Sequence, residues 1–150
     1  TADPEGLSRV SAMTRRTVPL LTTAGFYIAC WALGTTALAE AYTPEWTARR
    51  IAFFAMVSLG AVLFGRGAAW LWSLAGYLVG VALGELIGGI VYAQQRSRLD
   101  ERLLDPNFTQ NWEPHHPGWA IATGVFLGAT AIGLFVESRR ASRSTGPAVR

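Results

Sequence analysis

Long stretches without charge are the feature that most constrains this chain. No Asp, Glu, Lys or Arg lies between Glu113 and Glu137, and only Glu85 does so between Arg66 and Arg96. A helix on the surface of a soluble protein carries charge on its wet face, and these segments have no such face. With 51% hydrophobic residues in 150, the sequence predicts an all-α integral membrane protein. It excludes a disulfide scaffold, since there is one Cys, as well as a disordered tail protein and a typical water-soluble hydrolase.

Four apolar segments are predicted to cross the membrane as one four-helix bundle within residues 18–137. The expected spans are about 18–39, 44–64, 68–93 and 118–136. Residues 1–17 form an N-terminal tail, 94–117 the polar loop between the last two spans, and 138–150 a basic C-terminal tail. Pro19 suits the first turn of its helix, where the missing donor is not needed. In the loop, residues 96–104 are compatible with a helical extension of the third span.

The second span is the weakest of the four. Only residues 51–64 lie between Arg50 and Arg66, which is shorter than the usual ~20 residues. Thr43 is a suitable N-cap and Pro44 a suitable first helical residue. Counting from Pro44 therefore gives a sufficient length, provided that Arg49 and Arg50 extend to the interface. A tilted or re-entrant segment is the alternative.

The arginines predict the orientation. Four spans place both termini on one side, together with the Gly65-Arg66-Gly67 turn, and that side carries eight of the 13 basic residues. The positive-inside rule then predicts cytoplasmic termini (N-in/C-in) and an external loop at 94–117. All basic residues are Arg, which is typical of a GC-rich genome. We therefore expect the inner (plasma) membrane of a bacterium.

A glycine stripe in the third span, of the glycine-zipper type, is the most specific pattern. It recurs every four residues and therefore stays on one broad side of a helix: Gly76, Gly80, Gly84 and Gly88. Glycines at this spacing let another helix approach closely in lipid. The partner is either the fourth span of the same chain or another protein. In the first case the expected mating residues have the same spacing: Ala120, Gly124 and Gly128.

Glu85 is the only carboxylate deep within an apolar span. A charged side chain in the membrane is costly unless it is protonated, paired or hydrated. We interpret it as an intramembrane polar contact, a neutral hydrogen-bond donor to a neighbouring helix or subunit. A proton site or substrate contact is the alternative, although the other spans offer few polar groups for a proton path.

Residues for catalysis, metal binding or cofactor binding are not evident. His115 and His116 are the only histidines, and adjacent histidines on an extended chain point to opposite sides, so they rarely bind one ion. We interpret them as part of a solvated loop. No span holds a histidine for haem, and no phosphate-binding loop or nucleophile motif is present. We therefore expect no cofactor, no metal and no enzymatic activity.

Three functional hypotheses follow from the sequence. The first is an accessory or assembly subunit of a larger bacterial inner-membrane complex of respiratory or transport type, bound through the glycine stripe. Its expected partners are other integral membrane subunits and membrane lipids, and not nucleic acid. The second is a small homo-oligomeric transporter or channel with Glu85 in its pathway. The third is a membrane enzyme that uses His115 or His116 as general base.

Overall fold

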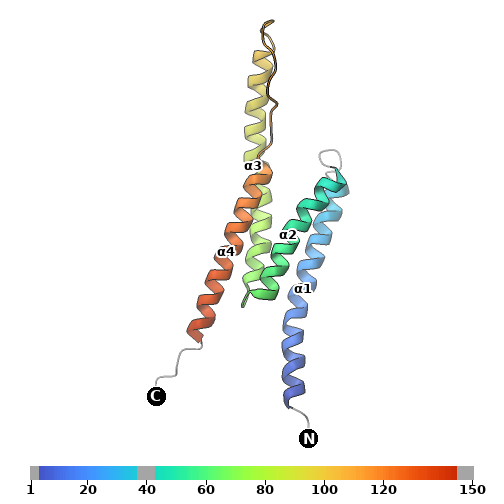
Figure 1. The fold of residues 1–150 in the computed structure, drawn as a ribbon, viewed down its shortest axis with the longest axis vertical. Coiled ribbons are helices and arrows are strands. Elements are labelled where there is room, and N and C mark those ends of the chain that lie inside the picture. Colours follow the sequence, from blue (N-terminus) through green and yellow to red (C-terminus); the bar gives the residue numbers. More distant parts are fainter. Residues whose placement is uncertain (1–3, 37–42, 145–150) are drawn as a thin grey trace. The chain divides into compact units, whose positions relative to one another are not determined.

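The chain is all-α, with four long apolar helices in the computed structural model (Figure 1). The structure describes residues 4–36 and 43–144, with side chains from residue 16 onward. The helices are α1 (Pro4–Thr36), α2 (Pro44–Phe64), α3 (Ala69–Arg102) and α4 (Gly118–Ser144). All four are long and apolar enough to cross a membrane. The chain is a four-span helical membrane protein, as the charge-free stretches predict.

The helices extend beyond the predicted spans. α1 begins at Pro4 instead of Val18, so that Pro19 lies inside the helix and residues 4–17 of the expected tail are helical. The predicted end of the first span at Ala39 lies outside the described residues. α3 continues to Arg102, as its polar extension allows, and α4 continues to Ser144. The apolar patterns mark where helices meet lipid, and backbone hydrogen bonds continue into the polar flanks.

The start of α2 follows the predicted capping. The Oγ1 atom of Thr43 accepts a hydrogen bond from the backbone N–H of Trp46 at 3.3 Å, and Pro44 begins the helix. The helix is uninterrupted from Pro44 to Phe64. Arg50 places its guanidinium 4.6 Å from the centre of the Trp46 ring, a cation–π contact within the first two turns of α2.

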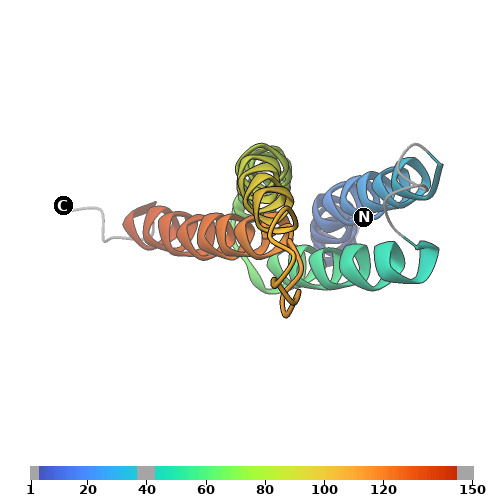
Figure 2. The same cartoon turned by 90° about the horizontal axis from the view of Figure 1, so that it is seen from above.

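The chain divides into two compact units. The first contains α1, α2, the start of α3 as far as Leu74 and the end of α4 from Thr130. The second contains residues 75–129. In the first unit α1 and α2 run side by side in opposite directions (Figures 1 and 2). Tyr27 and Ser58 join them through a buried hydroxyl–hydroxyl hydrogen bond of 2.8 Å.

The turn between α2 and α3 is closed by a carboxylate from α4. Of its two glycines only Gly67 adopts a positive φ, of 55°. A Cβ atom at Gly67 would also collide with Oε2 of Glu137. This residue is glycine both because of its conformation and because Glu137 occupies the space beside it.

Candidate functional site

The glycine stripe of α3 packs against α4 of the same chain. A Cβ atom added at Gly76 would lie 2.6 Å from Cβ of Ala129, and one at Gly80 would lie 2.6 Å from the carbonyl oxygen of Ala122. At Gly84 it would collide with the carbonyl oxygen of Gly118. The two backbones are therefore in direct contact, which only glycine permits at these positions.

The register of this contact differs from the one expected from sequence. The residues of α4 that contact α3 in the second unit include Gly118, Ala122 and Ala129. Gly124 and Gly128 are exposed, with nothing within 4 Å of an added Cβ, and Ala120 is also exposed. Ala120 and Gly124 each lie two positions, or about 200° around the helix, from the contacts at Gly118 and Ala122. Gly118 and Ala122 are also four residues apart, so a spacing of four alone does not distinguish the two faces.

Further contacts of the same face of α4 lie in the first unit. The hydroxyl of Thr130 donates to Oγ of Ser73 at 3.1 Å, and both side chains are buried. A Cβ at Gly133 would collide with the Trp72 side chain. α4 thus turns small or hydroxyl-bearing residues toward α3 in each unit: Gly118, Ala122 and Ala129 in the second, and Thr130 and Gly133 in the first.

Glu85 lies beside His116, a contact that the sequence analysis missed. The Oε2 atom of Glu85 is 3.9 Å from Nε2 of His116, and the Glu85 side chain is 61% exposed. The separation is longer than a hydrogen bond, so the contact is an ion pair only when His116 is protonated. The exposed Glu85 side chain is therefore not enclosed among helices. Its carboxylate lies beside the residues at the beginning of α4.

His116 is held at the beginning of α4. Its Nδ1 atom accepts a hydrogen bond of 3.3 Å from the backbone N–H of Gly118. Its ring also occupies the space where a Cβ of Gly88 would be. A neutral imidazole that accepts at Nδ1 carries its proton on Nε2, and Nε2 is the atom that faces Glu85. One feature of the sequence indicates this hydrogen bond: His116 lies two residues before Gly118, where a side-chain acceptor can reach the first backbone N–H of α4.

The two histidines have separate environments. The backbone N–H of His115 donates to Oε1 of Gln95 at 2.9 Å, which ties the segment before α4 to the polar extension of α3. The histidine side chain that lies beside Glu85 is that of His116. Among the side chains of residues 16–36 and 43–144, no group of three or more His, Cys, Asp or Glu is placed to hold a metal ion.

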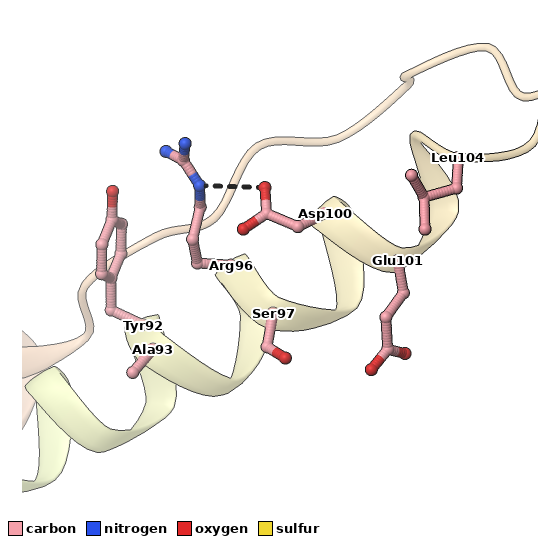
Figure 3. A pocket seen from close by; sticks show the side chains of 7 residues that line it. All are labelled: Tyr92, Ala93, Arg96, Ser97, Asp100, Glu101 and Leu104. Carbon is pink, nitrogen blue, oxygen red and sulfur yellow. Dashed lines mark hydrogen bonds and ion pairs between the residues drawn. The ribbon is translucent and has the colours of Figure 1, made fainter.

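An open groove lines one side of the polar extension of α3 (Figure 3). Arg96 and Asp100 form an ion pair of 3.3 Å within it, and both side chains are more than half exposed. An exposed pair of this kind contributes little to stability. The lining comes from α3 and the two residues after it, and includes Tyr92, Glu101 and Leu104. A groove formed by a single helix encloses no ligand, and we assign it no role.

Glu137 is a second carboxylate with a tertiary contact, and the sequence analysis does not predict this contact. Its side chain is 9% exposed, and both oxygens have partners. Oε2 accepts from the backbone N–H of Ala68 at 3.3 Å, and Oε1 accepts from Arg140 at 2.7 Å. A negative charge at the start of α3 is favourable, because the first backbone N–H groups of a helix point toward it. Glu137 therefore fixes the end of α4 to the α2–α3 turn.

Comparisons with known proteins give no relative. No protein-family model, no curated protein and no solved structure matches this chain.

Proposed function

We propose that this chain is an accessory or assembly subunit of a larger membrane complex, in which α4 lies between α3 and a helix of another subunit. The main support for this proposal is the composition of the α4 face that points away from α3. This outer face is exposed and carries small residues at helical spacing: Ala120, Gly124, Gly128 and Ala131.

Small residues on this face favour a partner helix over lipid. Glycine costs about 1 kcal/mol relative to alanine inside a helix, and it gives lipid tails little side chain to contact. The same residues let a second helix approach closely and gain dispersion contacts. The stripe on α3 is engaged by α4 within the chain, so the outer face of α4 replaces it as the proposed contact with a partner.

The proposed setting is the inner membrane of a bacterium, with both tails in the cytoplasm. Its support is the distribution of eight against five arginines and the absence of Lys from the sequence. The proposed partners are integral membrane subunits and lipids. We assign the chain no reaction of its own within the complex, which would be of respiratory or transport type.

The mass of the native particle tests this proposal. Membranes are solubilised gently, and the particle that contains the chain is isolated and weighed. We expect large unlike subunits for the wild type. We expect Gly124→Leu to leave a folded chain of 16.2 kDa outside the particle, because leucine would hold the partner helix away.

Gly25→Leu on α1 is the matched control. Gly25 is also exposed, with nothing within 4 Å of an added Cβ, and this variant should remain in the particle. Retention of Gly124→Leu in a complex of unlike subunits would refute the role of the outer face. A particle whose mass is only a multiple of 16.2 kDa would refute the accessory-subunit proposal.

A homo-oligomeric transporter or channel is the second candidate, and the Glu85–His116 contact favours it. A carboxylate and an imidazole, two groups able to carry a proton, lie 3.9 Å apart at one end of the α3–α4 contact. If the carboxylate is in a proton pathway, Glu85→Gln abolishes proton uptake into liposomes while abundance and assembly stay normal. If Glu85 has only a structural role, the variant behaves as the wild type in both measurements, and this is the result we expect.

A further inference from the structure

Three arginines from three different segments converge on the α2–α3 turn in the first unit. Arg66 is the central residue of the turn. Arg16 of α1 donates from Nη1 to the carbonyl oxygen of Leu63 at 3.3 Å, three residues before Arg66. Arg140 of α4 pairs with Glu137, which in turn accepts from the N–H of Ala68, two residues after Arg66. We call Arg16, Arg66 and Arg140 the turn arginines.

The positive charge of the turn arginines exceeds the negative charge beside them. Among the described side chains, Glu137 supplies the carboxylate at this turn. Its two oxygens already accept hydrogen bonds from the Arg140 side chain and the backbone N–H of Ala68. Arg16, Arg66 and Arg140 are all exposed. Three exposed arginines therefore lie at or beside this turn, while its buried carboxylate pairs with Arg140, and the remaining positive charge is available to an anion from outside the chain.

The turn arginines lie where apolar helix surface ends. Arg16 is the first residue of the candidate span in α1, and Arg66 follows α2 by two residues. Arg140 lies in the charged end of α4, after a run without charge from Gly118 to Val136. Residues at such positions sit at the membrane–water boundary. The anion that is always present at this depth is the phosphate of a lipid headgroup.

Exposed apolar side chains lie next to the turn arginines. Leu63 and Phe64, the last two residues of α2, are 43% and 88% exposed. A lipid bound with its phosphate at the turn would lay an acyl chain along these two side chains. The combination of guanidinium groups and apolar surface matches the two parts of a phospholipid, whereas a free anion uses only the first part.

We propose that the α2–α3 turn binds the phosphate of an anionic glycerophospholipid. Arg66 is its main ligand, and Arg16 and Arg140 flank it. A guanidinium presents a planar fork of donors that matches two phosphate oxygens. An anionic headgroup is favoured over a zwitterionic one, because the carboxylate of Glu137 is not free to accept an ammonium group.

Native mass spectrometry of the purified full-length chain tests this site, with phosphatidylglycerol and phosphatidylcholine as probes. We expect the wild type to retain phosphatidylglycerol in preference to phosphatidylcholine. Arg66→Gln should lower retention of phosphatidylglycerol by about five- to tenfold, the effect of losing one charge-assisted contact at a membrane surface. Arg66→Lys should retain an intermediate amount, because the charge remains and the fork is lost.

Arg98→Gln is the matched control. Arg98 is an exposed arginine on the polar extension of α3, and its removal should leave lipid retention unchanged. Equal retention of the two lipids by the wild type, or equal losses in Arg66→Gln and Arg98→Gln, would overturn the site. Displacement of the lipid by inorganic phosphate at equal concentration would overturn its assignment to a lipid. None of these outcomes depends on the mass of the native particle.

Discussion

Both faces of α4 carry small residues four positions apart, and the two faces have opposite surroundings. The inner face, which is turned toward α3 and the α2–α3 turn, meets backbone or side chains of the same chain at Gly118, Gly133 and Glu137. On the outer face, Gly124 and Gly128 have nothing within 4 Å of an added Cβ. A small-residue stripe therefore shows that a helix can be approached closely, whereas the rest of the chain decides which stripe its own helices use.

The largest expected effect comes from filling the inner contact. Gly80→Leu places a large side chain where an added Cβ is already 2.6 Å from the Ala122 carbonyl oxygen. The two backbones must separate, and we expect unfolding to become easier by about 3 kcal/mol or more. Thermal unfolding in detergent measures this change.

Gly89→Leu is the control on the same helix. An added Cβ at Gly89 meets nothing within 4 Å, so this variant should unfold like the wild type. If the two variants unfold at the same temperature, α3 and α4 do not pack through the glycine stripe in solution.

A smaller effect is expected at the end of the inner face. Glu137→Gln keeps the size of the side chain but removes the charge that Arg140 and the N–H of Ala68 contact. We expect a loss of about 1–3 kcal/mol in the same unfolding measurement. Glu101→Gln, which changes an exposed carboxylate, should have no effect, and an equal loss in both variants would remove Glu137 from the α2–α3 turn.

The smallest expected change in stability belongs to the outer face. Gly124→Leu should leave the isolated chain as stable as the wild type or up to about 1 kcal/mol more stable, since leucine favours a helix over glycine. Its effect should appear only in the particle mass. A loss of stability in the isolated chain as large as that of Gly80→Leu would mean that both faces of α4 pack within the chain.

Glu85 and Glu137 have surroundings that differ from what their places in the apolar runs indicate. Glu85 was singled out because it interrupts an apolar run, yet its side chain is 61% exposed beside His116. Glu137 closes an apolar run and drew no attention as a contact, yet it is buried with two partners. Position in an apolar run gives the depth of a residue along its own helix. It does not give the neighbours that other segments bring to it.

The sequence by itself determined the number of apolar helices, their membrane character, the cap of α2 by Thr43 and the existence of a close helix contact at the α3 glycines. These features follow from local composition and from spacing along one helix. Only the tertiary structure decided which face of α4 meets α3, that His116 lies beside Glu85, and that Glu137 accepts from the backbone N–H of Ala68 at the α2–α3 turn. The physical reason is that rotation and register of one helix against another are set by contacts between distant segments. A period of four residues is satisfied equally well by two opposite faces.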